Sequence, residues 1–333
     1  MRNIEYGVAR FSAIPSPPPT SGRKGTFVAL VGRSWPASVT YLAQAATQGH
    51  FRSSRNSRGP GVRAVGGGYG PTAPPPPSQG VLMPASLFRP LPRPHAGRTL
   101  LCVSFCGGGT AAFRPWAEVL PPDVELVLYC YPGREGRFTV PFAADWEALI
   151  RDALAAVRSL ADRPYLLVGH SMGAWVAFDL ARRLEKGADG DRPPSALVVS
   201  AAVSPAQVAE TRGISPSSGD TDEELLNWMG GVGQASSAVL AEPELRQMAV
   251  DVFRADLRVV DTYRHPPGAV VTTPMQVLHG ERDAVDARAA ESWRPLAKGP
   301  FAVERLPGGH FYTPEVWARL PERLTALRTV RSG

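Results

Sequence analysis

Ser171 is the residue of this chain whose surroundings most clearly indicate covalent chemistry. It stands at the centre of the pentapeptide Gly-His-Ser-Met-Gly at 169–173, between an apolar run (165–168) and a stretch of helical spacing (174–184). A tight strand-to-helix turn of this kind exposes a serine hydroxyl at a sheet edge, and its glycines are needed where a Cβ would meet neighbouring backbone. We therefore interpret Ser171 as a nucleophile.

A serine hydroxyl becomes reactive beside a base that a carboxylate orients. In chains with such a turn, the acid and then the histidine follow the serine. Asp283 comes shortly after an apolar run at 275–279, and His310 comes shortly after a run at 301–306. Both side chains are therefore expected at the strand ends that carry Ser171. The sequence predicts Ser171, Asp283 and His310 as the catalytic residues.

Other residues near these positions offer alternatives. Asp286 is the second candidate for the acid, and Asp283 is favoured because it comes first after the strand. His279 closes the preceding apolar run and is the second candidate for the base. His170 lies inside the turn, where chain geometry directs it away from the partner of the Ser171 hydroxyl, so we interpret it as structural.

A tetrahedral intermediate needs donors for its oxyanion. One is expected from the backbone N–H of Met172, directly after the serine. The other is expected from the backbone N–H of Cys106, which opens a Cys-Gly-Gly-Gly loop at 106–109 after the first apolar run. No base is placed for the Cys106 thiol, and no lysine of a phosphate-binding loop follows, so we expect neither thiol catalysis nor phosphate binding there.

From residue 98 onward, short apolar runs alternate with stretches of helical spacing. The runs have the length of buried strands and lie at 99–105, 124–130, 165–168, 196–200, 275–279 and 301–306. This alternation indicates an α/β chain with a mostly parallel sheet and helices on both faces. Combined with the serine turn, it predicts the α/β-hydrolase fold. Between about 204 and 272 only amphipathic helices are expected, and an insertion of that kind is typical of a lid.

The first 82 residues differ in composition from the rest. They are rich in Pro, Gly and Arg and carry nine Lys and Arg against one acidic residue, whereas the remainder carries 27 against 29. The net charge of +6 therefore reflects this leader and does not indicate nucleic-acid binding. We predict a disordered leader at 1–82, or alternatively a true start at Met83, and one domain at 83–333.

Cysteine content and hydropathy exclude further classes. Three cysteines are too few for a disulfide framework or a zinc site, so we expect a reduced, cytoplasmic protein without metal or cofactor. No apolar run approaches the roughly 18 residues of a membrane span, so no membrane partner is expected.

The chain from about Leu87 to Leu327 resembles the stand-alone type II thioesterases associated with polyketide synthases and nonribosomal peptide synthetases. Besides the serine turn, which many hydrolases share, several stretches carry the likeness: Cys106-Gly107-Gly108-Gly109, Phe113-Arg114-Pro115-Trp116, Tyr131-Pro132-Gly133-Arg134, Ala181-Arg182-Arg183-Leu184, Pro243-Glu244-Leu245, Arg254-Ala255-Asp256, Tyr263-Arg264 and Gly308-Gly309-His310-Phe311. The loop and insertion stretches are more specific than the turn.

The resemblance implies hydrolysis of acyl thioesters from the phosphopantetheine arm of an acyl or peptidyl carrier protein, which clears stalled or wrongly primed chains. It implies the same triad, Ser171, Asp283 and His310, with donors at Cys106 and Met172 and no cofactor. We expect a monomer whose partner is the carrier protein, with no nucleic-acid partner.

Some positions leave the substrate open. The family's glycine loop usually opens Pro-His-Ala, where this chain has Ser-Phe-Cys at 104–106. Arg114 and Arg134 could grip the pantetheine phosphate, although turn packing is the simpler interpretation. Trp228 and Met229 could line an acyl channel, although packing of a helix face is simpler.

Other functions on the same fold remain alternatives. They are a carboxylesterase or lipase acting on soluble esters and a chain-releasing cyclase. An acyltransferase can share the serine motif, but it predicts a larger body without the late Gly-Gly-His. A catalytically inactive binding module is disfavoured by the complete set of catalytic residues.

Overall fold

The computed structural model describes residues 86–160, 163–187, 191–207, 215–235 and 237–328. The predicted leader at 1–82 and the alternative start at Met83 lie outside these residues. The six predicted strands are all present: β2 (Arg98–Val103), β3 (Val124–Tyr129), β4 (Tyr165–His170), β5 (Ala196–Ser200), β6 (Met275–Gly280) and β7 (Phe301–Leu306).

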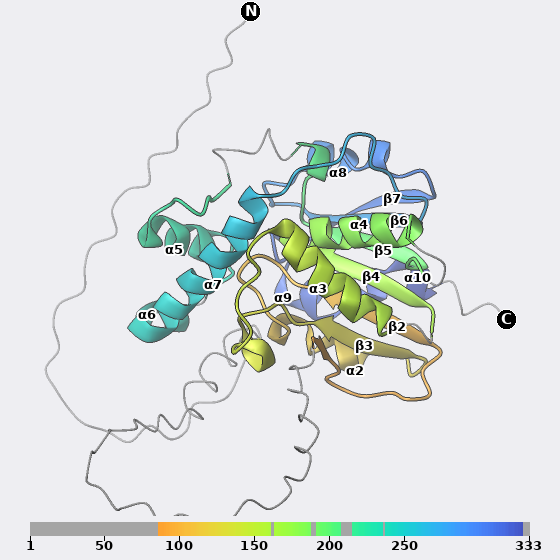
Figure 1. The fold of residues 1–333 in the computed structure, drawn as a ribbon, viewed down its shortest axis with the longest axis horizontal. Helices are drawn as coiled ribbons and strands as arrows, with labels where there is room; N and C mark the ends of the chain where they lie inside the picture. Colours follow the sequence, from red (N-terminus) through yellow and green to blue (C-terminus); the bar gives the residue numbers. More distant parts are fainter. Residues whose placement is uncertain (1–85, 161–162, 188–190, 208–214, 236, 329–333) are drawn as a thin grey trace, which may run out of the picture. The chain divides into compact units, whose positions relative to one another are not determined.

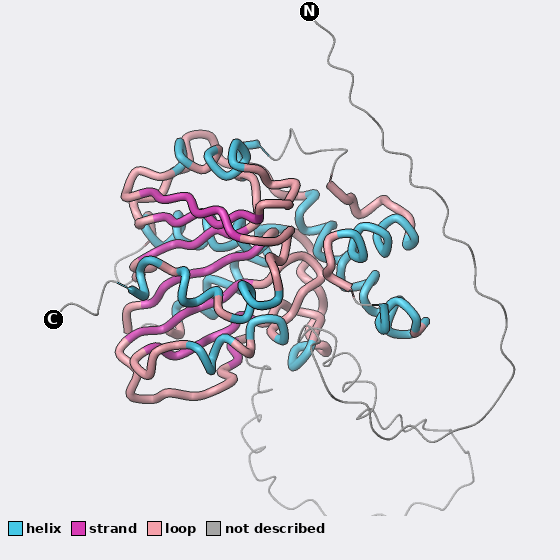
Figure 2. Tube along the Cα trace, turned by 180° about the vertical axis from the view of Figure 1, so that it is seen from behind, coloured by secondary structure: helices cyan, strands magenta, loops and turns pink. Residues whose placement is uncertain are grey.

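Together with a short strand, β1 (Leu87–Phe88), they form one seven-stranded sheet in the order β1-β3-β2-β4-β5-β6-β7. The strands are drawn in magenta, side by side, in Figure 2. Every neighbouring pair from β3 to β7 is parallel. The seventh strand, β1 (Leu87–Phe88), pairs antiparallel with the outer side of β3 and was not predicted, because two residues are too short to show a periodic pattern. The mostly parallel sheet confirms the predicted architecture.

Both faces of the sheet are covered, as successive side chains of β2 illustrate. Leu101 and Val103 belong to an apolar cluster shared with α3 (Trp146–Arg158) and α4 (Met172–Glu185), which lie on one face (Figure 1). Leu100 and Cys102 belong to a second cluster on the other face. Since side chains alternate along a strand, a run that is apolar throughout must be buried on both sides.

The second cluster is formed with short helices, and all of these connect strands or close the chain. The short helices of the described residues outside the segment between β5 and β6 are η1 (Ala111–Phe113), α2 (Trp116–Val119), η2 (Glu135–Arg137), α8 (Ala287–Glu291), η4 (Arg294–Leu296), α9 (Pro314–Ala318), η5 (Leu320–Arg323) and α10 (Thr325–Arg328). Trp116 of α2 is fully buried there and donates its indole N–H to the Trp317 carbonyl of α9 at 2.8 Å. None of the helices described is long and apolar enough to cross a membrane.

The segment between β5 and β6 carries α5 (Asp222–Gly231), α6 (Ser237–Ala241) and α7 (Pro243–Asp261). A capping box starts α5, in which Thr221 and Glu224 each bind the other's backbone N–H. Both α5 and α6 pack on α7, and α7 also contacts α3. We call the described residues 215–235 and 237–261 the helical insertion.

Candidate active site

Ser171 occupies a strained turn between β4 and α4. Its φ of 55° and ψ of −121° lie where non-glycine residues are rarely found, and its backbone N–H donates to the Ser200 carbonyl at 2.8 Å. A Cβ on Gly169 would collide with the backbone of Gly173, and a Cβ on Gly173 would collide with the carbonyl of Ser104. The two glycines therefore permit the turn, and they also bring the segment that opens the Cys106 loop directly against the start of α4.

His310 and Asp283 meet at the same edge of the sheet. The Nδ1 atom of His310 lies 3.1 Å from one carboxylate oxygen of Asp283 and 3.3 Å from the other. Their side chains are 11% and 4% exposed, so the contact is shielded from water. The two loops are joined because the Arg282 N–H donates to the Gly308 carbonyl at 2.8 Å. With Nδ1–H facing the carboxylate, Nε2 is left as an acceptor.

The two alternative residues are engaged differently. Asp286 is the N-cap of α8 and accepts the Ala289 N–H at 2.8 Å. His279 is 3% exposed at the end of β6, and its Nδ1 has no hydrogen-bond partner among the described residues. The geometry therefore favours Asp283 as the acid and His310 as the base.

The serine and the histidine are not yet joined. Within the part of the chain that the structure describes, the Ser171 hydroxyl makes no hydrogen bond to His310, whose side-chain bonds go to Asp283. Contacts of this kind are often long in ligand-free enzymes and shorten when substrate binds.

His170 is buried, with the centroid of its ring 5.3 Å from that of His310. It is 1% exposed, its Nδ1 lies 2.9 Å from the Ser200 hydroxyl, and that hydroxyl lies 2.6 Å from the hydroxyl of Tyr312. Burial, with a smaller contribution from His310, holds the pKa of His170 well below its ordinary value. A neutral ring packed among Phe311, Tyr312 and Trp317 fits the structural role predicted for it.

The two predicted oxyanion donors lie in buried backbone. Met172 is the first residue of α4 and is 4% exposed, and Cys106 is 8% exposed. Burial raises the pKa of the Cys106 thiol well above its ordinary value, and its Sγ lies 3.7 Å from the Phe253 carbonyl. A protonated thiol is a poor nucleophile, so the structure does not favour thiol catalysis at Cys106.

Arg134 does not lie free to grip a phosphate. Its guanidinium is 6% exposed and forms a two-pronged pair with Asp256 of α7. It also donates to the Gly108 carbonyl at 2.7 Å. Sequence reasoning singled out the stretches of both residues but missed this role for Asp256. The other arginine considered, Arg114, packs over the ring of Phe88 at 4.5 Å and donates to Thr110.

Trp228 and Met229, adjacent on α5, have different surroundings. Met229 is 1% exposed and belongs to the core. Trp228 is half-buried, its ring stacks on Phe253 with centroids 5.3 Å apart, and its centroid lies 6.2 Å from that of His310. Trp228 therefore forms an apolar wall beside the histidine, whereas Met229 does not.

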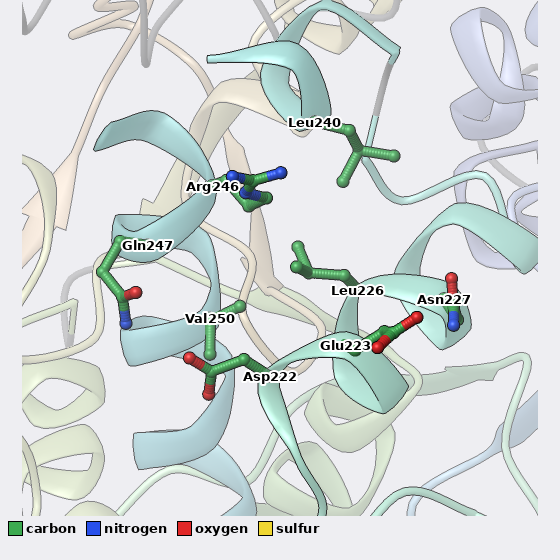
Figure 3. A pocket seen from close by; sticks show the side chains of 8 residues that line it. All are labelled: Asp222, Glu223, Leu226, Asn227, Leu240, Arg246, Gln247 and Val250. Carbon is green, nitrogen blue, oxygen red and sulfur yellow. The ribbon is translucent and has the colours of Figure 1, made fainter. Parts of the chain in front are cut away.

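A cavity of about 560 Å³ lies within the helical insertion (Figure 3). The residues that line it come from α5, α6 and α7 and are labelled in the figure: Asp222, Glu223, Leu226, Asn227, Leu240, Arg246, Gln247 and Val250. Neither Ser171, Asp283 nor His310 lines it. Over the described ranges, no group of three or more His, Cys, Asp or Glu side chains is arranged to hold a metal ion.

A serine in a strand-to-helix turn, followed by an acid and a histidine on later strand ends, defines a serine hydrolase site on an α/β-hydrolase sheet. Residues 98–327 match the thioesterase domain family. The chain therefore belongs to that family, which confirms the resemblance and the fold predicted from the sequence.

Named relatives refine this placement. The chain is 32% identical over 231 residues to the probable cadicidin biosynthesis thioesterase of Streptomyces griseus, covering 69% of this chain and 60% of the relative. It is 32% identical over 228 residues to thioesterase PikA5 of Streptomyces venezuelae, covering 68% and 79%. It also matches 10% of the much longer AMB antimetabolite synthetase AmbE of Pseudomonas aeruginosa, at 34% identity over 212 residues, which is 63% of this chain.

Solved structures agree. The type II thioesterase BorB from the borrelidin biosynthetic cluster superposes with a TM-score of 0.62 at 31% identity, covering 74% of this chain and 96% of BorB. RedJ, a thioesterase from the prodiginine pathway of Streptomyces coelicolor, gives 0.61 at 28% identity, covering 70% and 86%. The two Streptomyces relatives, BorB and RedJ are thus all named as thioesterases, and AmbE is named as a synthetase.

Proposed function

We propose that this chain hydrolyses acyl thioesters carried on the phosphopantetheine arm of acyl or peptidyl carrier proteins, and so clears aberrant chains from polyketide or nonribosomal peptide synthases. The observation that carries the proposal is the shielded His310–Asp283 contact, formed at the sheet edge where Ser171 sits in its strained turn. Membership of the thioesterase domain family and the names of the relatives support a thioester as the substrate.

In the first half of the reaction, Nε2 of His310 takes the proton of Ser171 as its Oγ attacks the thioester carbonyl carbon. The negative charge on the carbonyl oxygen is held by the N–H groups of Met172 and Cys106. The C–S bond then breaks, the departing sulfur takes the proton from His310, and the acyl group remains on Oγ. Asp283 fixes the imidazole tautomer and stabilises its cation.

In the second half, a water molecule attacks the acyl-enzyme carbonyl and gives a proton to Nε2 of His310. The C–Oγ bond breaks, Ser171 regains its proton, and the carboxylic acid leaves. Neither half requires a metal or a cofactor. The helical insertion acts as a lid, with Trp228 as an apolar wall beside the reacting carbonyl.

The carrier protein is the partner that this function requires, and the chain acts on it as a monomer in the cytoplasm, where carrier-bound chains are built. Three buried free cysteines, Cys102, Cys106 and Cys130, are compatible with that reducing compartment.

The test compares an acyl-carrier-protein thioester with the matched oxygen ester for wild-type protein and Ser171→Ala. Wild-type protein should hydrolyse the thioester faster and release a free acid, and Ser171→Ala should be inactive. Faster turnover of the oxygen ester would identify a carboxylesterase, and a cyclic product would identify a releasing cyclase. Full activity of Ser171→Ala would exclude the serine mechanism.

A further inference from the structure

The loop that opens with Cys106 is held in place by side chains of the helical insertion. Gln234, which follows α5, donates its side-chain N–H to the Cys106 carbonyl at 2.9 Å. Asp256 of α7 accepts the Gly107 N–H at 2.7 Å. The Cys106 carbonyl and the Gly107 N–H belong to one peptide group, so that group is fixed at both ends by the insertion.

Arg134, which lies between β3 and η2, also contacts both the loop and Asp256. It donates to the Gly108 carbonyl at 2.7 Å and pairs through both nitrogens of its fork with the Asp256 carboxylate. Asp256 is 5% exposed and Arg134 6%. A carboxylate at this depth requires the opposite charge beside it, and a buried pair that loses one partner leaves an uncompensated charge. The pair and the loop are therefore one hydrogen-bonded unit.

The loop needs such restraint because of its composition. Gly107 has a φ of +74° and is followed by two further glycines, so its peptide groups could rotate without a side-chain clash. The Cys106 N–H belongs to the preceding peptide group, which meets the anchored group at the Cα of Cys106. A shift of the anchored group would move that Cα and turn the Cys106 N–H away from the oxyanion. An oxyanion hole is effective when its donors are oriented before the reaction.

We propose that Asp256, together with Arg134 and Gln234, is a positioning residue for the oxyanion donor at Cys106. The donor is in place only while the helical insertion is docked on the loop, so closing the insertion and completing the oxyanion hole are one event. This inference rests on the proposed function, because it takes Cys106 as a donor in the reaction of Ser171.

The test uses Asp256→Asn and Gln234→Ala in the full chain. Asp256→Asn keeps the shape of the side chain but loses the charged pair with Arg134, and Gln234→Ala removes a half-buried anchor. Both should lower kcat for thioester hydrolysis by about 10- to 100-fold, less than the loss of a whole oxyanion donor, with KM changed less than threefold. The pH at which kcat/KM is half-maximal should not move, because the His310–Asp283 contact is untouched.

A second measurement reports on the oxyanion hole itself. A trifluoromethyl ketone accepts the Ser171 Oγ on its carbonyl carbon, His310 takes the serine proton, and the ketone oxygen becomes an oxyanion in the hole. Its affinity should fall by about the same factor as kcat in both variants, because the adduct resembles the tetrahedral intermediate.

The matched control is Asp152→Asn. Asp152 forms the same kind of two-pronged pair with buried Arg137, but Arg137 donates to the Cys130 carbonyl rather than to the Cys106 loop. This variant should lose thermal stability and keep kcat and ketone affinity. Wild-type kcat and ketone affinity in both test variants, measured on protein that circular dichroism shows to be folded, would overturn the inference. Failure of wild-type protein to hydrolyse the thioester and to bind the ketone would instead overturn the proposed function, and the inference with it.

Discussion

Asp283 and His310 are 27 residues apart in the chain, yet Nδ1 of His310 lies 3.1 Å from the Asp283 carboxylate. Their loops follow β6 and β7, which pair in parallel from Met275 opposite Phe301 to Gly280 opposite Leu306. The register of two strands thus sets the contact, and the orientation of the imidazole follows from it.

Asp283→Asn should lower kcat by about four orders of magnitude, because an amide in place of the carboxylate favours the wrong imidazole tautomer. Steady-state kinetics on a carrier thioester measures this. The neighbouring Asp286→Ala serves as the control: it removes the N-cap of α8, so it should cost about 1 kcal/mol of stability and leave kcat unchanged. The reverse pattern would make Asp286 the acid.

Trp228→Ala should change the preference for the acyl group. The half-buried ring lies beside His310 and on Phe253, so its removal should lower kcat/KM for long acyl chains by about tenfold more than for an acetyl group. Met229→Ala is the control, because this core side chain should cost about 2–5 kcal/mol of stability and leave the chain-length profile unaltered. An unchanged profile in Trp228→Ala would remove Trp228 from the substrate path.

Thiol reagents should leave the reaction intact. Burial raises the pKa of Cys102 and Cys106 well above the ordinary value and that of Cys130 to about 12, so a thiolate is scarce at neutral pH. Iodoacetamide at pH 7 should neither inactivate the folded enzyme nor label these three residues, as peptide mass spectrometry would report. Inactivation in step with labelling of Cys106 would indicate a catalytic thiol.

Stability should fall as the pH drops below about 6.5, the ordinary pKa of histidine. The pKa of His170 in the folded chain is well below that of the unfolded chain, so between the two values the unfolded chain binds the extra proton. His170 should therefore contribute up to about 1.4 kcal/mol of lost stability per pH unit on the acid side, and nothing above the ordinary value. The pKa of His265 is also lowered, so the wild-type pH dependence contains contributions from both histidines. Comparison with His170→Gln isolates the contribution of His170. Urea unfolding at pH 5 and 8 gives the change in the free energy of unfolding with pH for both proteins. An equal change in the two proteins would show that His170 is charged when folded.

Much of this site could be predicted because its residues are set by strand ends. Asp283 and His310 follow runs whose apolar character marks β6 and β7, and the glycines beside Ser171 mark its turn. The short β1 and the role of Asp256 could not be predicted in this way. A charged residue of an amphipathic helix, such as Asp256, is expected to face solvent. Its burial depends on pairing with Arg134, which is 122 residues earlier in the chain, and no sequence pattern indicates that contact.

Capture of the acyl-enzyme tests the central claim most directly. The enzyme is mixed with an excess of carrier protein that bears an acyl thioester, and the mixture is quenched in acid within one turnover. After digestion, the acyl mass should be found on the peptide that contains Ser171. The same peptide from Ser171→Ala should carry none, and free acid should not form. An acyl group on another residue, or free acid released by Ser171→Ala at the wild-type rate, would contradict the account.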